Sequence, residues 1–89
     1  MLKLKAHRRF EKDVKQALRR GKDVQKLWDI VEQLQEEMPL AARHRPHRLT
    51  GEWSPNHECH IEPDWLLIYF ISADTLELLR TGTHSDLFG

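Results

Sequence analysis

Hydrophobic and polar positions alternate at the start of the chain, and this alternation predicts a strand. Leu2, Leu4 and Ala6 alternate with Lys3 and Lys5, which is typical of a strand with one buried face. The spacing then changes to that of an amphipathic helix. Its expected apolar stripe consists of Phe10, Val14, Ala17 and Leu18.

A second amphipathic helix is predicted between Gly21 and Pro39. Gly21 can take the left-handed conformation that ends the first helix, and Asp23 can cap the start of the second. Pro39 cannot continue a helix, so the second helix should stop before it. Its expected apolar face consists of Val24, Leu27, Trp28, Val31 and Leu34.

The second half of the chain predicts a basic loop followed by three strands. Residues 39–48 have no periodic apolar pattern, and the strands are expected at 57–62, 65–71 and 75–81. The middle strand is apolar at every position and should be central in the sheet, with both faces buried. The connection at 72–74 has the length of a hairpin loop, so the last two strands should be antiparallel.

These elements predict an α+β fold in the order β-α-α-β-β-β, with two helices packed on one face of a mostly antiparallel sheet. The length of 89 residues is enough for one domain, residues 1–89, and one core. No apolar run approaches the roughly 20 residues of a membrane span, and the start lacks a signal-peptide core. A single cysteine, Cys59, fits a reducing compartment, so we expect a cytoplasmic protein without membrane contact.

The formal net charge of zero conceals a strong asymmetry along the chain. Residues 1–26 carry ten lysines and arginines against three acids, a net charge of +7, whereas residues 27–42 carry four acids and no base. Residues 43–60 add three arginines and four of the six histidines. This distribution suggests a polyanion as partner, although a solvated helix face is the alternative explanation.

The side chains suited to chemistry lie after residue 43, and each also has a simple structural explanation. His47 and His84 lie in predicted loops, where histidines are commonly just exposed. His60 and Asp64 flank Pro63, and Asp64 can be a turn residue. The aromatic candidates are Trp65, which can belong to the core, and Phe88, which can fold back onto it.

Two metal- or cysteine-based chemistries fit the sequence less well. His44-x-x-His47 and His57-x-Cys59-His60 offer nitrogen and sulfur donors, but their spacing matches no standard zinc finger. Cys59 would lie inside a strand without an oxyanion-hole turn, so nucleophilic catalysis is weaker still. We therefore expect no metal and no cofactor.

RNA cleavage without a metal ion suits these residues better. The ribose 2′-OH attacks its own phosphodiester, which needs a base for that hydroxyl and an acid for the departing 5′-oxygen. Histidine can serve either role near neutral pH, and arginines can stabilise the transition-state charge. An exposed RNA base could stack on Trp65 or Phe88.

Three blocks of the sequence, in the same order, resemble the YafQ branch of the RelE toxins of bacterial type II toxin–antitoxin modules. The blocks are His47-x-Leu-x-Gly-x-Trp53, His60-Ile-Glu-Pro-Asp-Trp-Leu-Leu-Ile-Tyr69 and Arg80-Thr-Gly-Thr-His-Ser-Asp-Leu-Phe88. Residues 1–46 resemble the family in length and layout more than in identity. Residues 54–59 depart from the pattern of the family.

The resemblance implies a ribosome-dependent mRNA endonuclease that cleaves codons in the A site of the 70S ribosome and has the RelE-like fold. His84 would be the leaving-group acid, and Asp64 or His47 the base. The implied catalytic residues are His47, His60, Asp64 and His84, and Trp65 and Phe88 would help to shape the pocket for the mRNA. Beside the resemblance, the arginines expected to bind the substrate phosphates are Arg43, Arg45, Arg48 and Arg80.

The resemblance also implies a cognate antitoxin, with a ribbon-helix-helix part that binds DNA and an acidic flexible part that wraps the basic half of this chain. The toxin itself would reach DNA only through that antitoxin. Two readings without RNA cleavage stay open, a ParE-like toxin acting on gyrase and an inactive partner in antitoxin-mediated autoregulation. The ParE-like toxins lack this set of histidines and aspartate.

Overall fold

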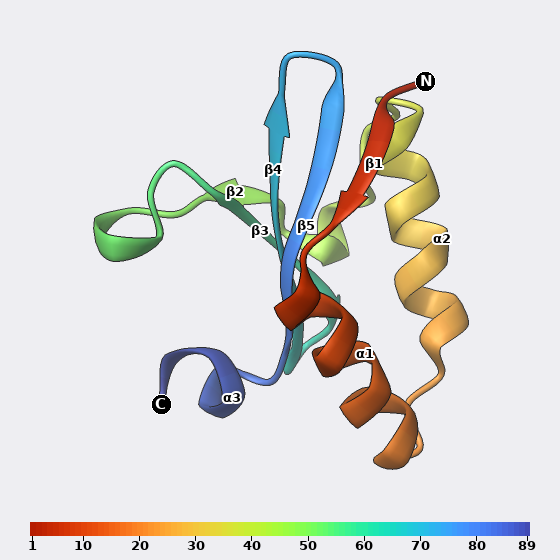
Figure 1. The fold of residues 1–89 in the computed structure, drawn as a ribbon, viewed down its shortest axis with the longest axis vertical. Helices are drawn as coiled ribbons and strands as arrows, with labels where there is room; N and C mark the ends of the chain where they lie inside the picture. Colours follow the sequence, from red (N-terminus) through yellow and green to blue (C-terminus); the bar gives the residue numbers. More distant parts are fainter.

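The computed structural model describes all residues 1–89 and contains five strands and three α-helices (Figure 1). In chain order they are β1 (Lys3–Ala6), α1 (Arg8–Arg19), α2 (Val24–Gln35), β2 (His47–Arg48), β3 (His57–Glu62), β4 (Trp65–Ser72), β5 (Thr75–Gly82) and α3 (His84–Phe88). Two single-turn 3₁₀ helices, η1 (Ala42–His44) and η2 (Gly51–Trp53), flank β2. None of the helices is long and apolar enough to cross a membrane.

All five strands form one sheet in the order β1-β5-β4-β3-β2, antiparallel except for the β1–β5 pair. β4 therefore has two strands on each side, which confirms its predicted central place. Ser72 and Thr75 pair directly, and Ala73 between them has a positive φ of 52°, so a two-residue turn joins β4 to β5 as expected. The predicted α+β class is confirmed.

The two faces of the sheet are covered differently. The main core lies between the sheet and helices α1 and α2, and alternate residues of β4 (Trp65, Leu67 and Tyr69) enter it. The intervening Leu66 and Ile68 form a small second cluster with Leu87 of α3. Residues 65–69 of β4 are apolar and buried because each face of this part of the strand meets a core.

The two elements that sequence reasoning missed are short. β2 lies where a loop was predicted, so the sheet has five strands instead of four. Its two residues are exposed and carry no apolar alternation, and they form a strand only because they pair with β3. α3 is five residues long, too short for a helical period, but Thr83 and Asp86 form the capping box that starts it.

The N-terminal segments keep their predicted types, but four residues predicted on buried faces are exposed: Leu4 and Ala6 of β1, Leu18 of α1 and Trp28 of α2. Gly21 has a φ of 80° and the Asp23 side chain accepts a hydrogen bond from the Gln25 backbone, as expected for the junction of the helices. Leu4 is 45% exposed on β1, an edge strand that pairs with β5 alone. Leu18 is 55% exposed, and Asp13 is buried on α1 instead, where it binds Arg80.

Candidate active site

Four side chains predicted to be catalytic lie together on the sheet face opposite α1 and α2. Cys59 and Ile61 point into the main core, so His60 between them points to the other face. His47 reaches the same place from β2, which pairs with β3, and the His47 and His60 ring centres are 6.4 Å apart. His84 begins α3, and its ring centre is 5.8 Å from that of His60.

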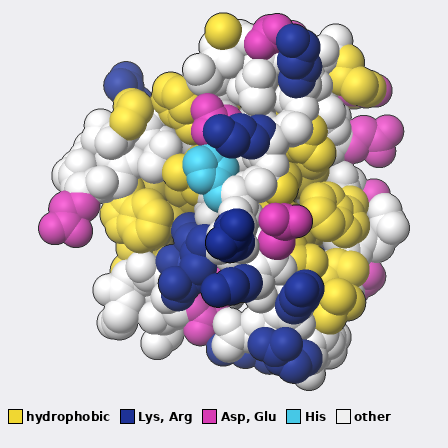
Figure 2. Space-filling model, in the orientation of Figure 1, with side chains coloured by type: hydrophobic (Ala, Val, Ile, Leu, Met, Phe, Trp, Pro, Cys, Tyr) yellow, Lys and Arg dark blue, Asp and Glu magenta, His cyan; other side chains and the backbone are white.

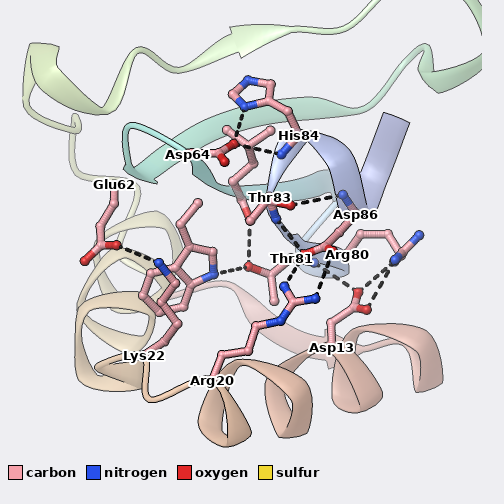
Figure 3. Close-up of polar contacts among 12 residues, drawn as sticks. Asp13, Arg20, Lys22, Glu62, Asp64, Arg80, Thr81, Thr83, His84 and Asp86 are labelled. Carbon is pink, nitrogen blue, oxygen red and sulfur yellow. Dashed lines mark hydrogen bonds and ion pairs between the residues drawn. The ribbon is translucent and has the colours of Figure 1, made fainter. Parts of the chain in front are cut away.

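Asp64, in the turn between β3 and β4, holds His84 by two hydrogen bonds to one oxygen (Figure 3). The backbone nitrogen of His84 donates to Oδ1 at 2.9 Å, and ring Nδ1 lies 2.6 Å from the same atom. These bonds, the backbone one first, lower the pKa of Asp64 below its usual value. Asp64 is therefore ionised at neutral pH and a weak base, and it leaves Nε2 of His84 free for proton exchange.

His60 and His47 are oriented by different partners. Nδ1 of His60 lies 3.2 Å from the carbonyl oxygen of Pro63, and its Nε2 lies 3.5 Å from a guanidinium nitrogen of Arg45. The carbonyl can only accept and the guanidinium can only donate, which places the proton of neutral His60 on Nδ1. Nδ1 of His47 lies 2.8 Å from the carbonyl oxygen of Arg45, and its Nε2 lies 3.1 Å from Glu58.

Glu58 is the site residue that sequence reasoning missed. Its side chain is 7% exposed, and Oε2 lies 3.1 Å from Nε2 of His47 and 3.8 Å from Nε2 of His60. One signal was present in the sequence: Glu58 precedes His60 by two residues in a predicted strand, which puts both on one face. The direct pairing of His47 with Glu58 across β2 and β3 gave no signal, because it depended on a strand that was not predicted.

The four arginines expected to bind substrate do not all reach the site. Arg43 and Arg45 line a cavity of about 130 Å³ together with His60 and Pro63. Arg48 is exposed on β2.

Arg80 donates to both carboxylate oxygens of Asp13, at 2.7 and 3.2 Å. This pair occupies the guanidinium of Arg80 and fastens α1 to β5. The geometry gives no support to a contact between Arg80 and RNA.

The two aromatic candidates differ in exposure. Trp65 is 1% exposed in the main core, and its Nε1 donates to Oγ1 of the buried Thr81 at 3.0 Å. The expectation that Trp65 stacks on an RNA base is therefore wrong, and its alternative reading as a core residue holds. Phe88 is 44% exposed, lies 6.4 Å from the His84 ring and meets Trp53 edge to face at 5.4 Å. Phe88 alone offers an open ring beside the histidines.

The donors considered for zinc point in different directions. Cys59 is fully buried among main-core residues, and burial followed by the nearby charge of Glu58 raises the pKa of its thiol to about 12. His44 is buried and bonded to the carbonyl oxygen of His60, and His57 stacks on Tyr69. No group of three His, Cys, Asp or Glu side chains is arranged to bind a metal ion.

The basic N-terminal part of the chain lies outside this site. Figure 2 shows lysine and arginine side chains gathered over the region where Figure 1 places α1. The exposed basic residues of this helix are Arg8, Arg9, Lys12, Lys15 and Arg19. Asp13 of α1 pairs with Arg80 of the sheet, and Arg20, directly after α1, pairs with Asp86 of α3; both pairs leave this outer surface open.

Comparison with known proteins places the chain in a family. Residues 2–89 match the family described as the bacterial toxin of type II toxin–antitoxin systems, YafQ. The mRNA interferase toxin YafQ of Escherichia coli K12 is 43% identical over 81 residues, which cover 90% of this chain and 88% of the relative.

Solved structures agree with that match. YafQ in the E. coli DinJ–YafQ complex superposes with a TM-score of 0.91 at 39% identity, covering all of both chains. A metal-bound toxin from Helicobacter pylori gives a TM-score of 0.93 at 40% identity, covering 99% of this chain and all of that one. The chain belongs to the YafQ family of toxins from bacterial type II toxin–antitoxin systems.

Proposed function

We propose that this protein is the toxin of a type II toxin–antitoxin module and that it cleaves mRNA on the ribosome by acid–base chemistry of its own side chains. The observation that carries the proposal is a row of three imidazole rings. The ring of His84, bonded to Asp64, lies beside the ring of His60, which in turn lies beside the ring of His47. The name of the E. coli relative, mRNA interferase toxin, supports it.

The reaction needs one proton removed and one supplied. The 2′-oxygen attacks the adjacent phosphorus while a base takes the hydroxyl proton, and the bond from phosphorus to the 5′-oxygen breaks. His84 gives the departing 5′-oxygen a proton from Nε2, because its Nδ1 is occupied by Asp64. The products are a 2′,3′-cyclic phosphate and a 5′-hydroxyl end.

The base is an imidazole, His47 or His60. Asp64 is poorly suited, because its lowered pKa weakens it as a base and His84 already occupies its Oδ1. Nε2 of His60 carries the lone pair of its neutral form and faces the cavity that Arg43 and Arg45 line. Those guanidinium groups are placed to stabilise the negative charge that develops on the phosphate oxygens.

The ribosome supplies what this site lacks. The cavity beside His60 is small, and Phe88 is the one exposed aromatic side chain among the site residues. Such a site has little surface with which to align free RNA for in-line attack. mRNA held in the ribosomal A site is already ordered, and correct orientation is worth up to several kcal/mol.

The partner that restrains this activity is a cognate antitoxin. The E. coli relative has been solved in complex with DinJ, which is described as its antitoxin in a second structure of that complex. An acidic flexible segment that folds on binding would match the exposed basic surface of α1. A ribbon-helix-helix part would bind DNA, so this chain reaches DNA only through it. The proposed ribosomal substrate supports a location in the cytoplasm.

Cleavage of one mRNA with and without ribosomes tests the proposal. The toxin is added to programmed ribosomes and to the same mRNA alone, and the new 5′ ends are mapped. We expect fast cleavage within the A-site codon and slow cleavage of free mRNA. Equal rates on both would contradict ribosome dependence, and growth arrest without any RNA cleavage would favour a ParE-like activity.

A further inference from the structure

We propose that Trp53 is a positioning residue of the active site: it holds the ring of Phe88 in place, so that the base of the nucleotide on the 3′ side of the scissile bond stacks on that ring. The inference rests on the proposed function and deepens it. Trp53 closes the first of the three sequence blocks that resemble the family, and the acid–base chemistry gives it no part.

The loop that carries Trp53 is closed by its own backbone hydrogen bonds. The backbone nitrogen of Leu49 donates to the carbonyl oxygen of Asn56 at 2.8 Å, and the backbone nitrogen of Asn56 donates to that of Trp53 at 2.9 Å. Gly51 begins η2 with a φ of 67°, a conformation that favours glycine. Leu49 and Trp53 also pack against the second cluster of β4 and α3, so the position of the indole is fixed by the loop and by the sheet.

Phe88, in contrast, has little support of its own. It is 44% exposed, lies next to the end of the chain and belongs to a helix of five residues. Its neighbour Leu87 is buried in the second cluster, but the Phe88 ring is not. Two rings lie next to it: Trp53 at 5.4 Å and an interplanar angle of 84°, the favoured edge-to-face geometry, and His84 at 6.4 Å. The loop fixes one of these neighbours and Asp64 fixes the other, so together they set the place of the Phe88 ring.

The position of Phe88 beside His84 indicates which nucleotide it receives. In the proposed reaction His84 gives its proton to the departing 5′-oxygen, and this oxygen belongs to the sugar of the nucleotide on the 3′ side. The base on that sugar is the one within reach of the Phe88 ring, which lies 6.4 Å from the His84 ring. An aromatic ring stacks on the π-face of any base, so the contact orients the leaving nucleotide without reading its identity.

The main test is single-turnover cleavage on programmed ribosomes by Trp53→Leu, with rates expressed per folded molecule. Leucine keeps an apolar side chain against the second cluster and removes the indole. We expect cleavage about 3- to 10-fold slower, the effect that loss of one aromatic pair produces. The pH profile should not change, because His84 and Asp64 keep their contact. Trp53→Phe keeps an aromatic ring and should recover most of the rate.

The variant Phe88→Ala shows whether Trp53 acts through Phe88. In Phe88→Ala protein, adding Trp53→Leu should slow cleavage by less than about 2-fold more, because the ring that Trp53 holds is already absent. mRNA with an abasic nucleotide on the 3′ side of the scissile bond should likewise remove the difference between Trp53→Leu and wild type. The full loss in either of these backgrounds would overturn the inference, since a purely structural role gives the same loss in all of them.

The matched control is Trp28→Leu. Trp28 on α2 is 38% exposed and meets Phe10 edge to face at 6.1 Å, so this variant also removes a tryptophan–phenylalanine pair. It lies on the opposite side of the sheet from the site histidines and should leave the cleavage rate unchanged. Equal rate losses in Trp28→Leu and Trp53→Leu would argue against the inference, because the effect would then come from lost packing alone.

NMR of the free protein tests the contact without RNA. With labelled phenylalanine, the ring signals of Phe88 should move in Trp53→Leu, because the ring current of the indole is lost, and those of Phe10 and Phe70 should stay. An unmoved Phe88 signal would contradict the contact. Wild-type toxin that shows this shift but cleaves no RNA would contradict the proposed function. Wild-type toxin that cleaves RNA, with folded Trp53→Leu equally fast, would overturn the role of Trp53 alone.

Discussion

One oxygen of Asp64 accepts hydrogen bonds from both the backbone nitrogen and the ring of His84, at 2.9 and 2.6 Å. The contact joins the β3–β4 turn to the first residue of α3, which are twenty positions apart in the sequence. The other side of α3 is fixed by Arg20, which binds Asp86 at 2.6 Å. The His84 ring is therefore held by its bonds to Asp64 and by the anchoring of α3, and its side chain stays exposed.

His84→Ala should abolish most of the cleavage without unfolding the protein. General acid catalysis contributes about 10²- to 10⁴-fold, so we expect a rate loss in that range on programmed ribosomes. His84 is exposed, so its removal leaves no core cavity and the unfolding temperature should change little. Ser85→Ala, at the next exposed position, is the control and should keep its toxicity. Translation arrest by His84→Ala at the wild-type rate would show that another group is the acid.

The products and the substrate requirement separate nucleophilic attack by the 2′-OH from attack by water. mRNA with a 2′-deoxy or 2′-O-methyl group at the cleavage position should resist, because its nucleophile is absent. Stripping metal from the toxin, with magnesium kept for the ribosome, should leave the rate unchanged. This treatment matters because a related toxin has been solved with bound metal. A 5′-phosphate end, which metal-activated water typically leaves, would contradict the mechanism.

Asp86→Asn should destabilise the protein in a pH-dependent way. The hydrogen bond from Arg20 first, and that from the Thr83 backbone second, hold the pKa of Asp86 well below its usual range. A lowered folded-state pKa gives stability that is complete above about pH 5 and is lost as the pH falls further. We expect a loss of about 1 kcal/mol at pH 7, typical of a helix cap.

The control for this loss is an exposed ion pair. Asp74→Asn removes the contact of Asp74 with Lys3, in which both side chains are largely exposed, and should cost less than about 0.5 kcal/mol. Denaturant unfolding at pH 7 and at pH 3 measures both variants. An Asp86→Asn loss that is as large at pH 3 as at pH 7 would rule out the ionised carboxylate as its source.

Trp65→Phe should reduce stability while leaving the chemistry intact. The smaller ring loses the bond to Thr81 and leaves space in the main core, a combined cost of about 1–3 kcal/mol. The cleavage rate per folded molecule should match wild type, because Trp65 is 1% exposed. Phe88→Ala provides the contrast, since it should lower the rate with little effect on unfolding. A slower cleavage rate by folded Trp65→Phe protein would contradict this prediction and indicate that Trp65 takes part in substrate binding.

The sequence by itself determined the helices and the long strands. The helical spacing of apolar residues predicts α1 and α2, and Gly21 and Asp23 mark the junction between them. The continuous apolar run of β4 predicts its central place in the sheet. These signals are local: each follows from the side chains of one segment and the period at which they recur. The chemistry of the side chains, together with the resemblance to the YafQ toxins, selected His47, His60, Asp64 and His84, which the fold brings together.

Only the tertiary structure decided which side chains face the site. β2 exists because His47 and Arg48 pair with β3, a long-range contact that leaves no apolar pattern, and that pairing places Glu58 against His47. Trp65 lies in the core, where its partner Thr81 comes from β5, and Arg80 is bound by Asp13 of α1. Both partners come from distant parts of the chain. Residue type determines what a side chain can do, but its partners depend on contacts that local sequence does not encode.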